Sequence, residues 1–124
     1  MRAKVVDASV IASIAFGEAR GNEAMALIND GELHAPELLD YELANIAWKK
    51  ARSEPKLASE IVAALRVILR VAIRRLRIDA AEVAELALSS GLSAYDAAYL
   101  WAARELGAEL ITFDATLKKA ARRI

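Results

Sequence analysis

The sequence contains no cysteine and only one histidine, His34, among its 124 residues. The absence of cysteine excludes a disulfide scaffold and a thiolate metal site, and it fits a protein of the reducing cytoplasm. One histidine cannot supply a zinc site that needs several imidazole ligands. Any metal chemistry in this chain therefore has to depend on oxygen ligands, which Mg²⁺ and Mn²⁺ prefer.

Long hydrophobic runs are also missing, although 56% of the residues are apolar. A membrane-spanning helix needs about 20 consecutive apolar residues, and the apolar segment Val62–Ile73 is interrupted by Arg66 and Arg70. The short apolar run near the N-terminus lies between Asp7 and Glu18 and has no cleavage pattern. We therefore expect neither a signal peptide nor a membrane association.

Charge is balanced overall but unevenly placed along the chain. The formal net charge is zero, so the composition does not by itself indicate a nucleic-acid binder. Nine Lys and Arg residues lie between Lys49 and Ile78, whereas seven acids lie between Asp79 and Asp114 with Arg104 as the only base. A basic segment can contact a polyanion and an acidic one a cation. Solvated helix faces are the simpler interpretation of this pattern taken alone.

Apolar periodicity, together with Gly and Pro positions, predicts short strands separated by helices. The expected strands are Ala3–Val6, Leu33–Ala35, Arg74–Ile78 and Glu109–Phe113. The expected helices are Ala8–Phe16, Asn22–Asn29, Leu38–Arg52, Lys56–Leu69, Ala80–Ser89, Ser93–Leu106 and Ala115–Ala121. Residues 122–124 either begin an edge strand or fray. This alternation predicts one α/β domain over residues 1–124 with a parallel sheet, whose ligands bind beyond the carboxyl ends of the strands.

Three acids stand where helices begin. Asp7 and Asp114 each follow a predicted strand and precede a helix, and Asp96 lies three residues after Ser93 in a capping-box pattern. Each such cap contributes about 1 kcal/mol to stability. Taken singly, capping is the better interpretation of all three acids, although the two strand-end positions also suggest a shared site.

Glu42 has no such simple explanation. It lies three residues after Leu39 and four before Ile46, so it projects from the apolar stripe of its predicted helix. A buried carboxylate is costly unless it is paired or bound to a metal. Glu42 either reaches water at the edge of the stripe, pairs with Lys49 or Lys50, or binds a cation. Asn45, one turn further on, either hydrogen-bonds Glu42 or serves packing alone.

The four acids gain meaning if they converge. At separations of about 5 Å and an effective dielectric near 20, each close pair of carboxylates repels by roughly 3 kcal/mol. Several such pairs would offset much of a typical domain stability of about 5–15 kcal/mol. A converged cluster therefore requires protons or cations, and oxygen ligands alone suit Mg²⁺ or Mn²⁺.

Four short motifs resemble those of a known family. They are Asp7–Ser9 after a strand, Glu42–Asn45 on a helix, Ser93–Ala97 with the sequence Ser-Ala-Tyr-Asp-Ala, and the strand-end segment Thr112–Asp114. With their spacing, they resemble the PIN-domain nucleases, in particular the VapC-type toxins of bacterial and archaeal toxin–antitoxin pairs. The resemblance covers nearly the whole chain, and the last two motifs are its most specific part.

The resemblance implies a three-layer α/β/α PIN-like domain with a short parallel sheet, and an endoribonuclease that depends on Mg²⁺ or Mn²⁺. It matches the family's catalytic and metal-binding acids to Asp7, Glu42, Asp96 and Asp114. Asp7 and Asp96 match the pair most directly tied to the metal, and Ser9 and Thr112 match small hydroxyl residues beside the acids. Glu42 either ligates a second metal or positions the attacking water.

The substrate and partners are also expectations. Lys49, Lys50, Arg52 and the group Arg66–Arg77 either contact the RNA backbone or face solvent or a partner. Five aromatic residues can stack on bases but more commonly belong to a core or an interface; they are Tyr41, Trp48, Tyr95, Tyr99 and Trp101.

The resemblance also implies a homodimer and a small antitoxin that places a basic side chain in the acidic site. Apolar residues of the helices between Ala8 and Leu27 and between Leu38 and Leu69 are compatible with such contacts. The alternatives are a catalytically silent PIN-like module that binds RNA or protein, and a structural module whose acids only cap helices.

Overall fold

A computed structural model describes residues 2–122 of the chain. Helices and strands alternate along it, and their bounds in chain order are β1 Ala3–Val6, α1 Ala8–Ala15, α2 Gly21–Ile28, β2 Glu32–Pro36, α3 Leu39–Ser53, the 3₁₀ helix η1 Pro55–Leu57, α4 Ala58–Ile68, β3 Ile73–Leu76, α5 Ala80–Ser90, α6 Ala94–Leu106, β4 Glu109–Ile111 and α7 Ala115–Arg122. The predicted alternation of strands and helices is confirmed.

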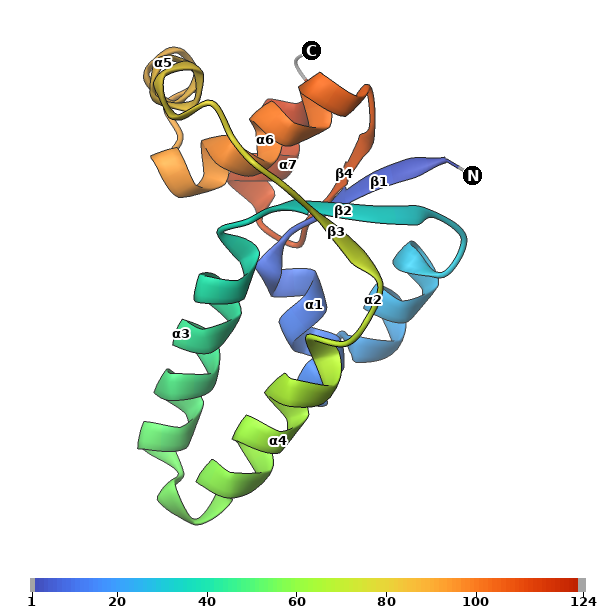
Figure 1. Ribbon diagram of the computed structural model, residues 1–124, viewed down its shortest axis with the longest axis vertical. Helices are drawn as coiled ribbons and strands as arrows, with labels where there is room; N and C mark the ends of the chain where they lie inside the picture. The colour runs from blue at the N-terminus through green and yellow to red at the C-terminus, as the bar shows by residue number, and fades with distance from the viewer. Residues whose placement is uncertain (1, 123–124) are drawn as a thin grey trace.

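The strands form one parallel sheet in the order β3-β2-β1-β4. Helix α6 packs against β1, β2 and β4, and α5 and α7 pack against α6. Helix α1 contacts α2, α3 and α4. Figure 1 shows α5 and α6 above the sheet and α1 to α4 below it. Because helices cover both faces of a parallel sheet, the predicted three-layer α/β/α arrangement is confirmed.

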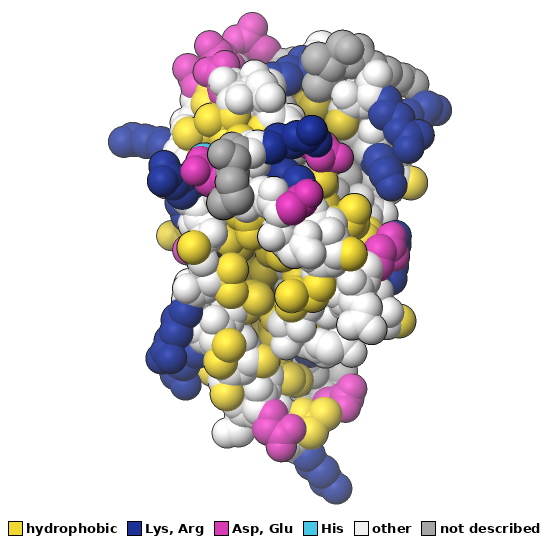
Figure 2. Space-filling view, turned by 90° about the vertical axis from the view of Figure 1, so that its right-hand side faces the viewer, with side chains coloured by type: hydrophobic (Ala, Val, Ile, Leu, Met, Phe, Trp, Pro, Cys, Tyr) yellow, Lys and Arg dark blue, Asp and Glu magenta, His cyan; other side chains and the backbone are white. Residues whose placement is uncertain are grey.

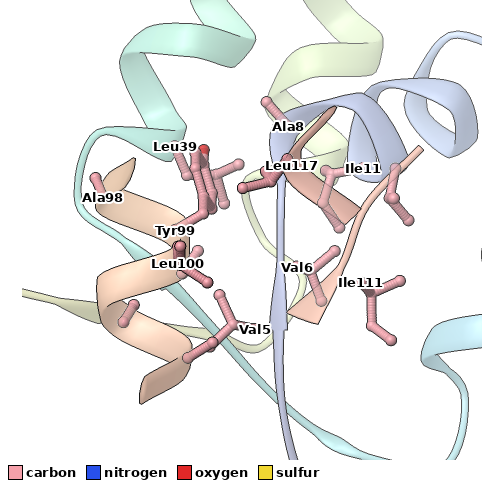
Figure 3. Close-up of a cluster of buried hydrophobic side chains, with 14 of the residues drawn as sticks. Val5, Val6, Ala8, Ile11, Leu39, Ala98, Tyr99, Leu100, Ile111 and Leu117 are labelled. Carbon is pink, nitrogen blue, oxygen red and sulfur yellow. The ribbon is translucent and has the colours of Figure 1, made fainter. Parts of the chain in front are cut away.

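The core follows the alternation of side chains along β1. Val5 and Val6 are both fully buried. In Figure 3, Val5 points toward Leu100 of α6 and Val6 points toward Ile11 of α1. Successive side chains of a strand point to opposite faces, so β1 contributes to both layers and holds α1 and α6 in place on either side of the sheet.

Some predicted boundaries need correction. Strand β4 ends at Ile111 rather than Phe113, and the next residue, Thr112, bonds the side chain of Asp7 through its hydroxyl. Strand β3 covers Ile73–Leu76 rather than Arg74–Ile78.

The predicted helix Lys56–Leu69 begins as a 3₁₀ turn with Pro55 at its first position. Proline fits there because the N–H that it lacks would have no partner within the helix. Arg122 ends α7 as a helical residue, and the alternative of an edge strand at residues 123–124 lies outside the described residues.

The topology sets where a site can form. Strands β1 and β4 are neighbours, so their carboxyl ends open side by side at one edge of the sheet. The N-terminal end of α6, which Ser93 caps, faces the same edge. Gly107 ends the helix in a left-handed turn with a φ of 58°. None of the helices within residues 2–122 has the length and hydrophobicity needed to cross a membrane.

Candidate active site

A pocket of about 530 Å³ opens at the carboxyl edge of the sheet. Its walls include all four acids singled out from the sequence, which are Asp7, Glu42, Asp96 and Asp114. They come from the end of β1, the first turns of α3 and α6, and the turn between β4 and α7. The expected convergence is therefore present, although each acid arrives on a different element.

Asp7 is the most constrained of the four carboxylates. Its side chain is 7% exposed, and Oδ1 accepts hydrogen bonds from the Ser9 N–H at 3.1 Å, the Ser9 hydroxyl at 2.6 Å and the Val10 N–H at 3.3 Å. Oδ2 accepts a hydrogen bond from the Thr112 hydroxyl. Burial raises the pKa of Asp7, and these hydrogen bonds oppose that rise. Asp7 is thus a helix cap, as its sequence position predicts, but a cap whose carboxylate also lines a pocket.

Thr112 fastens two strand ends together. Its hydroxyl donates to Asp7 and accepts a hydrogen bond from the Asp114 N–H at 3.0 Å. The Ser9 hydroxyl oxygen accepts a hydrogen bond from the Phe113 N–H at 3.4 Å. The two hydroxyl residues predicted beside the acids therefore hold the β4–α7 turn against the start of α1.

Asp114 also has a capping role. Its Oδ1 accepts a hydrogen bond from the Leu117 N–H at 2.8 Å at the start of α7, as predicted. A cap uses one carboxylate oxygen. The second oxygen of this exposed residue remains available at the pocket.

Glu42 is held by an unexpected partner. The Tyr99 hydroxyl, on α6, donates a hydrogen bond to Glu42 Oε1 at 2.6 Å. Burial raises the pKa of Glu42, the negative charges of Asp7 and Asp96 raise it further, and the Tyr99 hydrogen bond opposes the shift. The same burial raises the pKa of Tyr99, with Glu42 adding to it, so the phenol stays protonated and donates.

One of the alternatives for Glu42, an ion pair with a nearby lysine, is not found among residues 2–122. Lys50, one of its candidate partners, instead pairs with Glu18 at 2.7 Å. Asn45 lines the same pocket, and within residues 2–122 no hydrogen bond joins it to Glu42. Glu42 therefore belongs to the pocket and not to a surface ion pair.

Asp96 has the least restrained carboxylate. The Ser93 hydroxyl accepts a hydrogen bond from the Asp96 N–H at 3.2 Å, which is one half of the predicted capping box. The return bond from the carboxylate is absent among residues 2–122, so the box is incomplete. Burial raises the pKa of Asp96, and the charges of Asp114 and then Asp7 raise it further. Its oxygens therefore remain unused by the fold.

No basic side chain balances this cluster. Among the described residues, neither Lys, Arg nor His lines the pocket, so any contact of the basic group near Glu42 with the RNA backbone would lie outside it. Arg52 lies over the Trp48 ring at 4.3 Å, and Arg75 bonds Asp40 at 2.6 Å. Within residues 2–122 no cationic side chain neutralises the acids, so protons or an external cation have to do so.

The donor atoms fit a hard divalent cation, because all four candidate ligands are carboxylates. Within residues 2–122 no three acidic or histidine side chains are grouped tightly enough to enclose a metal ion. Both Asp7 oxygens accept hydrogen bonds, whereas the Asp96 carboxylate has no such contact among the described residues. The pocket therefore supplies the right ligand chemistry, with Asp96 as the side chain most able to turn toward a cation.

Sequence reasoning missed the role of Tyr99. As predicted for most of the aromatics, the ring is core, with 1% exposure, and Figure 3 places it between α6 and Leu39. Its hydroxyl nevertheless serves the site. The available signal was spacing, since Tyr99 lies three residues after Asp96 and therefore on the same side of α6.

Comparison with known proteins identifies relatives across nearly the whole length. The PIN domain family matches residues 4–123. Ribonuclease VapC3 of Pyrobaculum aerophilum is 36% identical over 119 residues, covering 91% of this chain and 90% of that protein. Ribonuclease VapC9 of Mycobacterium tuberculosis is 31% identical over 113 residues, covering 91% of this chain and 87% of that protein.

Solved structures agree on the architecture. A crystal structure of a Pyrobaculum aerophilum protein superposes with a TM-score of 0.79 at 26% identity, covering 98% of this chain and 81% of that one. The structure of Mycobacterium tuberculosis VapC20, described as a toxin that cleaves the sarcin-ricin loop, has a TM-score of 0.66 at 22% identity and covers 94% of each chain. At that identity the second likeness concerns the fold alone.

Proposed function

The chain belongs to the PIN domain family and is a VapC-type ribonuclease, and we propose that its pocket of four carboxylates is the active site and binds Mg²⁺ or Mn²⁺. The observation that carries this proposal is the convergence of four acids from four separate elements on one pocket, which no base among residues 2–122 lines. A fold does not gather like charges without a neutralising partner, because their mutual repulsion and their burial both oppose folding.

A bound divalent cation makes an attacking water more acidic and shields the charge of the phosphodiester. The carboxylates of the chain would supply the ligands of this cation. Asp7 and Asp96 would hold the cation, and Asp114 would contribute the carboxylate oxygen that does not cap α7, directly or through water. Ser9 and Thr112 keep Asp7 in one rotamer, because both hydroxyls donate to its carboxylate.

Glu42 has a separate place in this scheme. It lies on α3, across the pocket from the β1–β4 edge, and Tyr99 fixes the orientation of its carboxylate. From there it either ligates a second cation or orients the attacking water. Its raised pKa, which results mainly from burial, leaves it closer to the range in which a carboxylate exchanges protons.

Cleavage of RNA by purified protein tests the proposal. We expect cleavage with Mg²⁺ or Mn²⁺ and none with chelator, and we expect Asp96→Asn to lose about 100-fold or more, because it removes several kcal/mol of transition-state stabilisation. Asp79→Asn is the matched control: Asp79 caps α5 at a helix start outside the pocket, and asparagine preserves the cap. Equal cleavage by wild type and Asp96→Asn contradicts the proposal.

Calorimetric titration with Mn²⁺ separates catalysis from binding. The wild type and Asp79→Asn bind the ion, and Asp96→Asn binds it more weakly. A protein that binds RNA and Mn²⁺ but never cleaves corresponds to the catalytically silent alternative, and it would remove the enzymatic part of the proposal while retaining the site.

We also propose that the protein is a cytoplasmic homodimer and that an antitoxin binds and inhibits it. The exposed apolar side chains of α4 and the turn after it support this: Val62, Val67, Leu69 and Val71 are 39%, 65%, 38% and 40% exposed. Figure 2 shows hydrophobic side chains gathered down the middle of one face. An antitoxin that places a Lys or Arg side chain in the pocket would neutralise the same carboxylates as a cation.

Light scattering on the protein alone, and on the protein co-expressed with an antitoxin, tests both partners. A dimer alone and a larger complex that is inactive on RNA are the expected results. A monomer at all concentrations contradicts the dimer, and undiminished RNA cleavage by the complex contradicts antitoxin occupation of the pocket.

A further inference from the structure

Two tyrosines stand exposed at the mouth of the acidic pocket. Tyr41 is 79% exposed and Tyr95 is 67% exposed, and both line the pocket. They contrast with Tyr99, which lines the same pocket but is buried in the core. The two exposed rings therefore contribute little to the stability of the fold, because a ring in water gains none of the free energy of burial.

The two rings occupy equivalent positions. Tyr41 immediately precedes Glu42 in the first turn of α3, and Tyr95 immediately precedes Asp96 in the first turn of α6. Successive residues of a helix are rotated by about 100°. A carboxylate turned into the pocket thus has an aromatic neighbour turned toward its rim, and this arrangement occurs on both walls.

The pocket is larger and less polar than a cation site requires. Its volume of about 530 Å³ is lined by Leu38, Ile46 and Ala8 as well as by the acids. Sites for organic ligands the size of a nucleotide span roughly 300–1,000 Å³ and combine apolar walls with a few polar groups. A cation would explain the acids of the pocket but not its apolar lining, which would suit a flat, apolar ligand.

We propose that Tyr41 and Tyr95 stack on the nucleobases that flank the scissile phosphodiester, so that the enzyme selects unpaired RNA. This inference rests on the ribonuclease function proposed above. Within residues 2–122 the pocket offers no basic side chain to a phosphate, so substrate contacts inside it fall to the cation and to the rings. Stacking on an aromatic side chain contributes about 1–3 kcal/mol per base and tolerates any base. Bases in a duplex are stacked on one another and cannot reach such rings.

Steady-state cleavage of an unstructured oligoribonucleotide, with Mn²⁺, tests the inference. Tyr41→Ala and Tyr95→Ala each raise KM about 5- to 150-fold, which is the stacking energy expressed as a ratio, and leave kcat nearly unchanged. Tyr41→Phe and Tyr95→Phe retain the wild-type KM because they retain the ring. Trp48→Ala is the matched control, since Trp48 is a 52% exposed aromatic on α3 that does not line the pocket.

A second measurement uses the same oligoribonucleotide annealed to its complement. The wild type prefers the single strand, and the two alanine variants lose that preference. Melting temperatures stay within a few degrees of wild type because both rings are exposed, and Mn²⁺ titrations are unchanged because both neighbouring acids remain. An unchanged KM in both alanine variants overturns the inference, as does a rise of the same size in Trp48→Ala.

Failure of the inference and failure of the proposed function give different results. If the wild type cleaves and the alanine variants match it, stacking is wrong and the ribonuclease stands. If the wild type does not cleave, fluorescence anisotropy with a labelled oligoribonucleotide and Ca²⁺ still measures binding. Weaker binding by the alanine variants then supports stacking without catalysis. Equal RNA binding, with only antitoxin binding weakened, assigns the rings to the protein partner and overturns the inference.

Discussion

The two ends of the parallel sheet treat charge in opposite ways. Near the amino ends of the strands, Lys4 on β1 is buried, and its Nζ reaches Asp30 at 2.5 Å and the Leu27 carbonyl at 2.7 Å. On β2, the Glu32 carboxylate lies 2.8 Å from His34. At the carboxyl ends, four carboxylates share one pocket with hydroxyl and backbone donors, and none of the described basic residues lines it.

This difference separates structural charge from functional charge. A charge that meets its partner within the chain contributes to the stability of the fold and needs no external ion. A group of like charges without a partner stores unfavourable energy, which an external cation relieves. The carboxyl edge is therefore the part of the molecule whose stability depends on what it binds, and the predictions below test that contrast.

The largest expected effect concerns two glutamates, one at each end. Glu42→Gln should reduce the rate of RNA cleavage by about 100-fold or more, because it removes a carboxylate that orients water or a second cation. Glu32→Gln should leave the rate unchanged, because Glu32 pairs with His34 away from the pocket. Initial rates with Mn²⁺ measure both. Equal losses in the two variants would abolish the distinction between the ends.

Divalent cations should stabilise the fold through the carboxyl edge alone. At a concentration 100 times its dissociation constant, a cation that binds only the folded state adds about 2.7 kcal/mol, which corresponds to a rise in Tm of about 10 °C for a chain of this size. Thermal melts with and without Mn²⁺ measure the shift. It should shrink in Asp96→Asn and persist in Asp30→Asn, and a full shift in Asp96→Asn would place the ion elsewhere.

Tyr99→Phe should lower kcat about 10-fold, the usual effect of losing a residue that orients a catalytic group. The Tyr99 hydrogen bond holds the pKa of Glu42 down against burial, so its loss should move the acid limb of the pH–rate profile to higher pH. A purely structural role of Tyr99 would lower activity without moving the profile. Tyr95→Phe removes an exposed hydroxyl from the same helix and should change neither quantity.

The smallest effects are opposite pH dependences of stability in chelator. Burial raises the pKa of Asp96, so the folded protein binds that proton more tightly than the unfolded chain. Its stabilising contribution is complete below the unfolded pKa and is lost as pH rises. Asp96→Asn should therefore melt a few degrees above wild type at about pH 7 and lose that advantage toward about pH 4.

Asp30 should behave in the reverse sense. The hydrogen bond from Lys4 lowers the pKa of Asp30, so its contribution is present above the unfolded pKa and is lost as pH falls. Asp30→Asn should melt below wild type at about pH 7 and approach it toward about pH 4. Thermal melts of both variants across pH measure the crossing, and curves of the same sign at both ends would contradict the contrast.

Much of the site was predictable from single residues and their neighbours. Asp7 and Asp114 follow strands directly, and in a parallel sheet the carboxyl ends of neighbouring strands meet at one edge, so their shared site followed from local pattern and topology. The short strand after α4 was harder, because no glycine or proline marks its start, and its predicted bounds were displaced. Thr112 was expected beside the site, but its position beyond the end of β4 was not. Its hydroxyl bonds Asp7, which lies 105 positions away in the sequence.

Periodicity, helix-capping residues and the order of the motifs were enough to establish the alternation of elements, the family resemblance and the four acids, because each of these is written in residues close together in the chain. Folding was needed to show that, within residues 2–122, Asp96 lacks its return capping bond, Tyr99 supports Glu42, and no base lines the pocket. These facts concern which side chains from distant segments share one volume, and that is decided by packing across the whole sheet. The charge imbalance of the carboxyl edge is therefore a property of the fold, although every charge in it was visible in the sequence.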